Sequence, residues 1–295
     1  MLDPVGILPV DKPGGITSHD VVARARRALG TRKIGHAGTL DPMATGLLIL
    51  GVGAATRLLT FLVGLDKTYT ATVRLGVATD SDDADGEVTG ETDAAGVERA
   101  RIEAAMTALT GRIAQVPSTV SAIKVGGRRA YDLARAGEEV ELAAREVVVS
   151  RFALLDLRPV GRALDLDVVV DCSSGTYVRA LARDLGAALG VGGHLTALRR
   201  TRIGDFDVAD AAGLDALDPQ RLLPPAEVAA RVLGRLDVTA EEARDLRHGK
   251  RIGDAARLTG ERAAAIDPDG VLVGIVERRG SELKSLMNMP EGASA

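Results

Sequence analysis

The hydrophobic and polar positions along the chain follow two patterns, one typical of strands and one typical of helices. Residues 47–50 form an apolar run that predicts a buried strand, and residues 68–79 alternate as a half-buried strand does. Further strands are predicted at residues 6–10, 147–157 and 164–172, and helices at residues 18–29, 54–65, 97–109, 130–136 and 176–189. Ser18 is the predicted cap of the first helix. Hairpin-like strands with helices between them favour an α+β fold with a mixed or antiparallel sheet over a doubly wound sheet.

The pattern changes toward the end of the chain. Ala, Asp and Pro dominate residues 210–225, and the strand signal fades there. Beyond this segment, residues 239–248 predict a helix capped by Thr239 and its following glutamates, and residues 263–277 predict a hairpin that turns at residues 267–270. We therefore expect a large domain over residues 1–225 and a small β-rich domain over residues 233–295.

The composition is that of an ordinary globular protein. Of the 295 residues 46% are hydrophobic and 26% are charged, and no apolar run approaches the roughly 20 residues that a bilayer span requires. The N-terminus has no basic segment or cleavage site of the kind that marks a secretory signal. Cys172 is the one cysteine, which excludes an internal disulfide and a multi-cysteine zinc site. We expect a cytoplasmic protein without a membrane partner.

The charge distribution is more informative than the net charge of −4, which by itself argues against a nucleic-acid partner. The basic residues gather in clusters: Arg24, Arg26, Arg27, Arg32 and Lys33; Lys124, Arg128 and Arg129; Arg199, Arg200 and Arg202; Arg244, Arg247, Lys250 and Arg251. Each cluster taken singly is best explained as a solvated surface, but this does not explain why several of them flank the motifs described below. Acids concentrate at residues 80–87, where a calcium-loop alignment fails because Ser81 and Thr92 fall at ligand positions.

The segment at residues 35–48, G-H-A-G-T-L-D-P-M-A-T-G-L-L, isolates one acid, Asp41, among glycines and apolar residues. Pro42 biases Asp41 away from helical conformation, and the glycines let the backbone pass close to a ligand. Because a buried strand follows, the acid sits on a loop fastened to the core. From the residues themselves, a working carboxylate and an ordinary Asp-Pro turn both stay open.

Six motifs in fixed order over roughly two hundred residues resemble those of the TruB family, the bacterial tRNA pseudouridine-55 synthases. They are Lys12-Pro13-Gly14-Gly15 with Thr17-Ser18; residues 35–48; Asp66-Lys67-Thr68-Tyr69; Gln115-Val116-Pro117-Ser118 with Ser121-Ala122-Ile123-Lys124; Ser174-Gly175-Thr176-Tyr177-Val178-Arg179; and Leu198-Arg199-Arg200-Thr201. One departure is Val120, which stands where an aromatic residue or His commonly precedes Ser-Ala-x-Lys.

The resemblance implies three catalytic residues. Asp41 is the expected nucleophile, Tyr69 the ring that stacks on the target base and takes part in proton removal, and Arg179 the partner of the catalytic carboxylate. A surface salt bridge is the simpler alternative for Arg179. The reaction that the family catalyses needs no metal and no other cofactor, and the route through a glycal formed by elimination is the one we expect.

The resemblance also implies substrate-binding residues. They are His36, Tyr177, Leu198 and Lys12, with Arg199 and Arg200 as contacts to the RNA backbone. His36 would fill the space left by a flipped-out nucleotide, although a lone loop histidine is more often structural. Lys12 either contacts RNA or supports the Asp41 loop. Tyr177 and Arg179 would project to the same side of an extended backbone, whereas a helix beginning before Tyr177 would separate them.

The expected function is the conversion of uridine at position 55, in the T-loop of tRNA, into pseudouridine. The small domain resembles a PUA-type RNA-binding module, and we expect tRNA as the partner, a monomer, and no obligatory protein partner. The alternative is a non-catalytic protein that binds or folds tRNA. A glycoside hydrolase would require a second carboxylate near Asp41, for which Asp20 and Asp66 are candidates.

Overall fold

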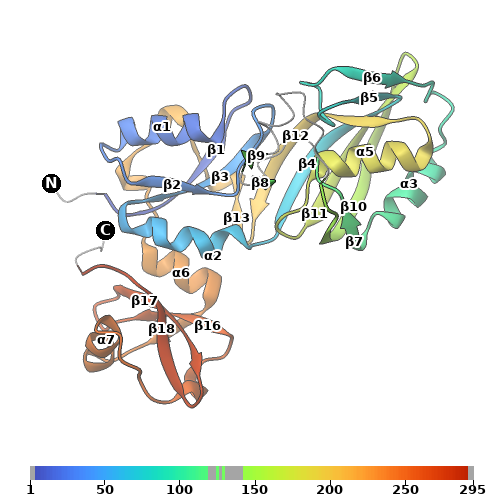
Figure 1. The fold of residues 1–295 in the computed structure, drawn as a ribbon. Coiled ribbons are helices and arrows are strands. Elements are labelled where there is room, and N and C mark those ends of the chain that lie inside the picture. The colour runs from blue at the N-terminus through green and yellow to red at the C-terminus, as the bar shows by residue number, and fades with distance from the viewer. Residues whose placement is uncertain (1–3, 119–123, 126–127, 130–141, 292–295) are drawn as a thin grey trace. The chain divides into compact units, whose positions relative to one another are not determined.

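The computed structural model of the chain describes residues 4–118, 124–125, 128–129 and 142–291, and Figure 1 shows the helices and strands. The chain divides into two compact units, of which the first comprises Met1–Gly64 and Ile203–Ala295 and the second comprises Leu65–Arg202. The predicted helix at residues 130–136 lies outside the described residues, as does Val120. The predicted division of the chain at residues 225–233 stays a prediction.

The N-terminal sheet of the first unit is covered by a helix. Its strands are β1 (Gly6–Lys12), β2 (Ile34–Ala37), β3 (Thr45–Val52) and the short β14 (Ala212–Gly213). Strands β1 and β2 both pair antiparallel with β3, whose residues are buried after Thr45, as expected for the predicted buried strand. The helix α1 (Ser18–Ala28) packs Val21, Val22 and Ala25 against this sheet. The loop that joins β2 to β3 is therefore anchored in a core at both ends.

The start of α1 differs from the prediction by one residue. Thr17 caps the helix and forms a capping box with Asp20, whereas Ser18 is the first helical residue. The difference frees the Ser18 side chain for a tertiary contact. The helix predicted at residues 54–65 is also divided, into the 3-10 helix η1 (Gly53–Leu58) and the helix α2 (Leu59–Val63).

The second unit is built on an antiparallel sheet. Its strands, in spatial order, are β12 (Gly193–Ile203), β4 (Lys67–Leu75), β11 (Ala163–Cys172), β10 (Arg145–Val160) and β7 (Gly111–Gln115). The helices α3 (Arg99–Ala108) and α5 (Val178–Leu189) lie side by side over it (Figure 1). The strand predicted at residues 68–79 breaks at Gly76, whose φ of 100° ends β4 before β5 (Val77–Thr79). Strand β5 pairs with β6 (Val88–Glu91), and β8 (Lys124–Val125) pairs with β9 (Arg128–Arg129).

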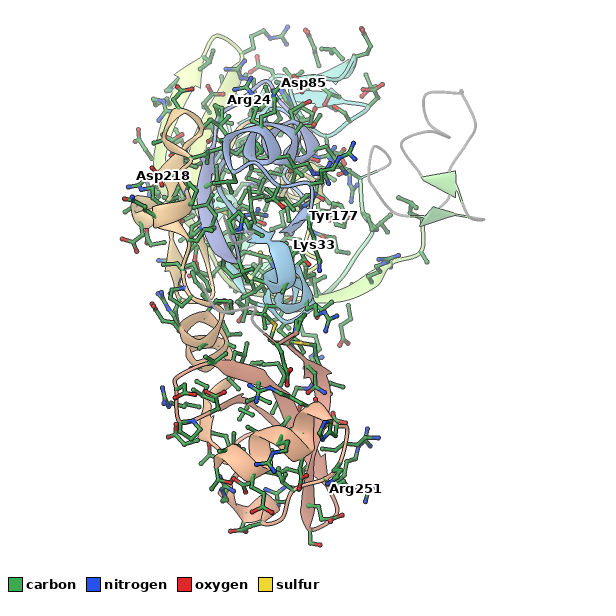
Figure 2. The ribbon with its side chains drawn as sticks, turned by 90° about the vertical axis from the view of Figure 1, so that its left-hand side faces the viewer. Arg24, Lys33, Asp85, Tyr177, Asp218 and Arg251 are labelled. Carbon is green, nitrogen blue, oxygen red and sulfur yellow. The ribbon has the colours of Figure 1, made fainter. Side chains whose placement is uncertain are left out.

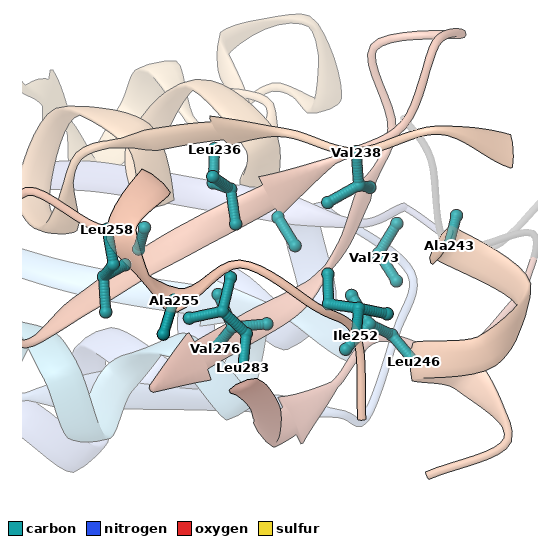
Figure 3. Close-up of a cluster of buried hydrophobic side chains, with 12 residues drawn as sticks. Leu236, Val238, Ala243, Leu246, Ile252, Ala255, Leu258, Val273, Val276 and Leu283 are labelled. Carbon is teal, nitrogen blue, oxygen red and sulfur yellow. The ribbon is translucent and has the colours of Figure 1, made fainter. Parts of the chain in front are cut away.

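The C-terminal part of the first unit is a small sheet with its own core (Figure 3). Its elements are α6 (Pro225–Leu233), β15 (Arg235–Asp237), α7 (Ala240–Arg247), β16 (Arg262–Ile266), β17 (Leu272–Arg279) and β18 (Glu282–Asn288). Thr239 and Glu242 form the capping box that the sequence predicts for α7. Strands β16 and β17 form the predicted hairpin, which turns at Gly270 with a φ of 78°. The short elements that complete the chain are β13 (Phe206–Asp207), η2 (Val208–Asp210), η3 (Leu214–Ala216), η4 (Pro219–Arg221) and η5 (Ala255–Arg257).

The last basic cluster is largely paired within this C-terminal module. Arg247 bonds to Asp267 at 2.9 Å, Lys250 to Asp245 at 2.7 Å and Arg251 to Glu282 at 3.2 Å. Arg251 lies on the outside of the module (Figure 2). The pairs of Lys250 and Arg251 are exposed and contribute little stability, whereas Asp267 is buried. All three pairs reduce the net positive charge of this surface. The α+β class and the antiparallel strand pairing are confirmed. No helix within the described ranges is both long and apolar enough to cross a bilayer.

Candidate active site

The Asp41 loop is held in place by the N-terminal motif. Lys12 is 0% exposed, and its ammonium group donates to the carbonyl oxygens of Ala44 at 2.6 Å, Pro13 at 2.9 Å and Pro42 at 3.2 Å. Two of these carbonyls belong to the segment that directly follows Asp41. Lys12 was expected either to contact RNA or to support this loop. Its hydrogen bonds to three carbonyl oxygens favour the supporting role.

Ser18 and Gly15 hold the other parts of the same loop. The Ser18 hydroxyl donates to the Leu40 carbonyl at 3.1 Å and accepts from the Leu40 amide at 2.9 Å. The Gly15 amide donates to the Pro42 carbonyl at 2.9 Å. We call Lys12, Gly15 and Ser18 the N-terminal cradle. The cradle grips the residues on both sides of Asp41, so the position of its half-buried carboxylate is set by the backbone around it.

We predict that Lys12→Met loosens the loop without removing any side chain expected to react. Because the variant leaves buried carbonyl oxygens without this donor, the free energy of unfolding should fall by about 1–3 kcal/mol. Turnover should fall by up to about 100-fold, since small displacements of a reacting group are costly. Denaturant unfolding and single-turnover kinetics measure the two effects. Lys284→Met, at an exposed position, is the matched control, and equal behaviour of both variants would contradict a supporting role.

The Asp20 carboxylate already takes part in the capping box of α1. Its carboxylate accepts from the Thr17 amide at 2.8 Å and from the Thr17 hydroxyl at 2.7 Å, and these bonds lower its pKa. A carboxylate used in a capping box is poorly suited to serve as the second acid of a glycoside hydrolase.

His36 lies in strand β2, opposite Leu50 of β3, and not in the loop itself. Its ring meets the ring of His19 on α1 edge to face, with the centroids 5.5 Å apart. The imidazole is therefore fixed by a strand and by a neighbouring ring. Its expected role in substrate contact stays a prediction.

Tyr69 lies on β4, in the second unit, and is 7% exposed. Residues of β4 alternate between buried and partly exposed, so Lys67 and Tyr69 share the buried face. Burial, assisted by the nearby charge of Arg200, lowers the pKa of Lys67 to about 8. The surroundings of Tyr69 are thus largely removed from water.

The Leu198 to Arg200 segment lies on β12, a strand that the sequence did not predict. Leu198 is buried, Arg199 is half-buried, and Arg200 is 1% exposed. Both arginines are expected to contact the RNA backbone, but only Arg199 presents its side chain toward solvent. The contact by Arg200 therefore requires RNA to reach a buried group.

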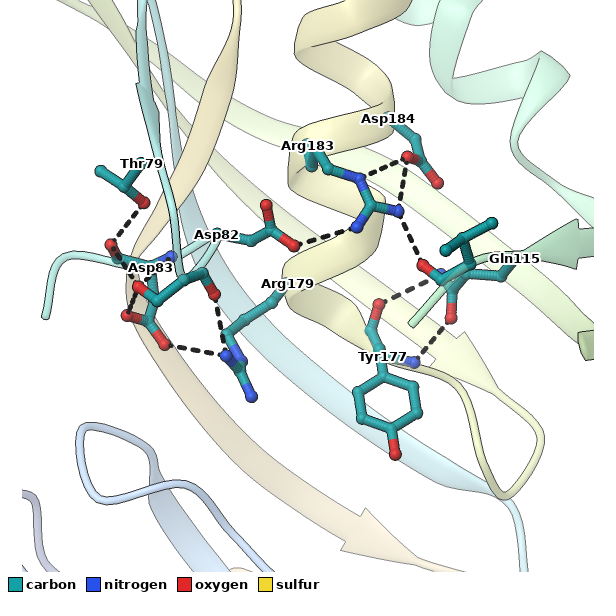
Figure 4. A network of polar contacts seen from close by, with 10 residues as sticks. Thr79, Asp82, Asp83, Gln115, Tyr177, Arg179, Arg183 and Asp184 are labelled. Atoms are coloured by element: carbon teal, nitrogen blue, oxygen red, sulfur yellow. Dashed lines mark hydrogen bonds and ion pairs between the residues drawn. The ribbon is translucent and has the colours of Figure 1, made fainter. Parts of the chain in front are cut away.

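Arg179 is a buried arginine of α5 that bonds to an acidic loop, which excludes the surface salt bridge considered for it. Its side chain is 4% exposed and its guanidinium donates to the Ser81 carbonyl at 2.8 Å and to the Asp83 carboxylate at 3.3 Å (Figure 4). One turn along α5, Arg183 bonds to Asp82 at 3.0 Å. Asp82 has a φ of 63°, an uncommon conformation that turns adjacent carboxylates toward different arginines.

Tyr177 and Arg179 do not share the extended backbone that would align their side chains. Tyr177 is extended, with φ of −102° and ψ of 106°, but α5 begins at the next residue, so Arg179 is helical. Burial and pairing position Arg179, whereas Tyr177 stays half-buried at the end of the helix. Of the two alternatives considered for this pair, the extended backbone is therefore excluded, and the helix that separates the side chains begins directly after Tyr177.

The structure thus divides the predicted site residues between the units. Lys12, His36 and Asp41 belong to the first unit, and the others, Tyr69, Tyr177, Arg179, Leu198, Arg199 and Arg200, belong to the second. The pairing of Arg179 with Asp41 stays a prediction. Asp83 was missed, although its position in the acid-rich segment at residues 80–87 was a usable signal. Within the residues described, no cluster of His, Cys, Asp or Glu is arranged to hold a metal ion.

Comparisons with known proteins cover almost the whole chain. Residues 26–178 match the family described as “TruB family pseudouridylate synthase (N terminal domain)”. Residues 179–231 match “tRNA pseudouridylate synthase B C-terminal domain”, and residues 233–290 match “tRNA Pseudouridine synthase II, C terminal”.

Relatives of similar length share more than half of their residues with this chain. The “tRNA pseudouridine synthase B” of Leifsonia xyli subsp. xyli is 56% identical over 97% of this chain and 96% of its own length. The protein of the same name from Nocardia farcinica is 58% identical over 95% of this chain and 92% of its own. Among solved structures, a chain of “a Cbf5-Nop10-Gar1 Complex” is similar, with a TM-score of 0.69 and 25% identity, over 93% of this chain and 78% of that one.

Proposed function

Because the chain belongs to the TruB family of pseudouridylate synthases, we propose that it converts a uridine of tRNA into pseudouridine, at position 55 in the T-loop. The enzyme is an isomerase. The bond from ribose C1′ to uracil N1 breaks, the base turns, and a bond from C1′ to C5 forms. The proton on C5 is lost and a proton is gained at N1, so the overall reaction is redox-neutral.

Asp41 is the nucleophile or base that starts bond cleavage. A carboxylate in this role must stay ionised and must point at the substrate. The N-terminal cradle favours a fixed orientation, because it holds the backbone on both sides of Asp41. Arg179, when paired with this carboxylate, would keep it ionised, because an adjacent guanidinium favours the charged form. We favour the route through a glycal, in which Asp41 or a neighbouring group removes a ribose proton.

Tyr69 holds the detached base and takes part in removing its proton. Stacking on an aromatic ring contributes on the order of 1–3 kcal/mol per base, which is enough to retain a flipped uracil. The burial of Tyr69 supports this role, since a site closed to water prevents hydrolysis of a reactive intermediate. His36, Tyr177 and Leu198 complete the contacts to the flipped nucleotide, and Arg199 contacts the RNA backbone.

The observation that carries the proposal is the Asp41 loop, in which the N-terminal cradle bonds to the backbone on both sides of Asp41. The small domain predicted at residues 233–295 would add RNA contacts in the manner of a PUA-type domain. We place the enzyme in the cytoplasm, with tRNA as its partner and the monomer as its working state.

The test is to incubate purified protein with an unmodified tRNA transcript, without added metal or cofactor, and to map pseudouridine by carbodiimide-dependent primer extension. A stop at the T-loop uridine is expected. Binding of the transcript without any stop would favour the non-catalytic alternative, and a stop elsewhere would contradict the proposed position.

Tyr69→Phe should keep the stacking surface and lose the hydroxyl group. We expect tRNA affinity to change by less than about threefold, while turnover falls by about 10²–10⁴-fold, the range typical of losing an acid-base group. Filter binding and single-turnover kinetics measure these quantities. Tyr69→Leu, which removes the ring as well, should lower both tRNA affinity and turnover. Normal turnover of Tyr69→Phe would leave Tyr69 a packing role only.

A further inference from the structure

Gln115 makes an unusual contact for a side chain: it bonds to the main chain of Tyr177 as a neighbouring strand would. Gln115 is the last residue of β7 and is 1% exposed. Its amide nitrogen donates to the Tyr177 carbonyl at 3.1 Å, and its amide oxygen accepts from the Tyr177 N–H at 2.8 Å (Figure 4). The N–H of Tyr177 can only donate, which determines the orientation of the amide.

Tyr177 depends on this contact for its backbone conformation. It is the N-cap residue of α5, and its own side chain makes no capping hydrogen bond. The turn that precedes it contains Gly175, whose φ is 88° and which supplies no rigid constraint. The Tyr177 carbonyl also accepts from the Leu181 amide at 3.2 Å, as the first bond of the helix. Gln115 therefore accepts from the Tyr177 N–H and shares the Tyr177 carbonyl with the first turn of the helix.

The helix itself has other anchors. Arg179 is bonded to Ser81 and Asp83, and Arg183 is bonded to Asp82 and, at 2.7 Å, to the Val116 carbonyl. Buried residues along α5, among them Leu181 and Leu185, attach it to the core. Loss of the Gln115 amide should therefore leave α5 in place and release the backbone of Tyr177.

We propose that Gln115 is a positioning residue for pseudouridine formation: by bonding to both main-chain groups of Tyr177, it aims the ring that contacts the flipped uridine. This inference rests on the proposed role of Tyr177 in substrate contact. Because Gln115 itself need not touch the substrate, its effect should be transmitted entirely through Tyr177.

Gln115→Met removes both hydrogen bonds at nearly constant length. The expected result is a fall in kcat of about tenfold with KM changed less than about twofold, because a misaimed ring affects the flipped nucleotide and not the tRNA body. In a Tyr177→Ala background the same substitution should have no further effect on kcat. The matched control is Gln220→Met, at an exposed glutamine of η4, which should behave as wild type in both backgrounds.

Gln115→Glu supplies a second, independent readout. A protonated carboxyl can accept from the Tyr177 N–H and donate to its carbonyl, as the amide does, whereas an ionised carboxylate faces that carbonyl with like charge. The kcat of this variant relative to wild type should therefore rise as the pH falls from 8 to about 5.5, through the raised pKa expected of a buried carboxyl. The same variant tests the inference if Gln115→Met does not fold.

Additive losses in the Tyr177→Ala background would overturn the inference, as would a pH-independent Gln115→Glu variant. Wild-type kcat in Gln115→Met would overturn it as well. If Tyr177→Ala alone turned over normally, the role of Tyr177, and with it this inference, would fail, while the proposed function would still stand or fall with the primer-extension stop at the T-loop.

Discussion

Asp41→Asn is expected to abolish pseudouridine formation, by about 10⁴-fold or more, while tRNA affinity changes less than about threefold. Asparagine keeps the size of the side chain and the N-terminal cradle keeps the loop, so the variant loses little except the charge and the nucleophilic oxygen. Bond cleavage needs that oxygen, whereas contacts to RNA phosphates do not. Primer extension after carbodiimide treatment and filter binding measure the two quantities on the same preparation.

Asp269→Asn is the matched control, because Asp269 is exposed in the β16–β17 turn of the C-terminal module. It should retain full activity. A folded Asp41→Asn variant that no longer binds tRNA would assign the carboxylate to binding, and one that still forms pseudouridine would require another nucleophile. Asp66→Asn then becomes the decisive variant, since Asp20 is committed to its capping box.

Asp83→Asn should reduce turnover by about 100-fold, because the Asp83 carboxylate holds the guanidinium of Arg179 in a buried site. The substitution removes the charge that compensates a buried arginine, and breaking such pairs is strongly unfavourable. The free energy of unfolding should fall too, by up to about 3 kcal/mol, since the amide oxygen still accepts one hydrogen bond. Single-turnover kinetics and denaturant unfolding measure the effects.

The neighbouring acid provides the matched control. Asp82 is buried in the same loop, and burial raises its pKa. Its ion pair is with Arg183. Asp82→Asn should therefore lower stability with a smaller loss of turnover. If both variants lost turnover in proportion to stability, the loop would serve only to stabilise the unit, and Asp83 would have no specific effect on Arg179.

Much of the fold was predictable because it depends on local patterns. The apolar run of β3, the alternation of β4, the capping box of α7 and the turn of the β16–β17 hairpin are each encoded within a few residues. The errors occurred where the local signal is weak. Strand β2 is only four residues long, and β12 mixes arginines, threonines and a histidine with its apolar residues, so neither was predicted.

The cap of α1 shows how a tertiary contact overrides a local choice. Thr17 and Ser18 are both good capping residues, and the sequence does not distinguish them. Ser18 instead bonds to Leu40, 22 residues away, which leaves Thr17 as the cap. The bonds between Ser18 and Leu40 also hold the Asp41 loop, so one tertiary contact determines both the cap of α1 and the geometry of the site.

The sequence by itself determined the family, the order of the motifs and the choice of Asp41 as the expected nucleophile, because these reside in short segments with characteristic residues. Only the tertiary structure decided how those segments are held. Lys12 reaches Ala44 across 32 residues, Gln115 reaches Tyr177 across 62, and Arg179 reaches the Ser81 carbonyl across 98. Such contacts have no local sequence signature, because each joins a side chain to a main-chain group, and every residue has main-chain groups. Strand pairing and helix packing determine which main-chain group lies within reach.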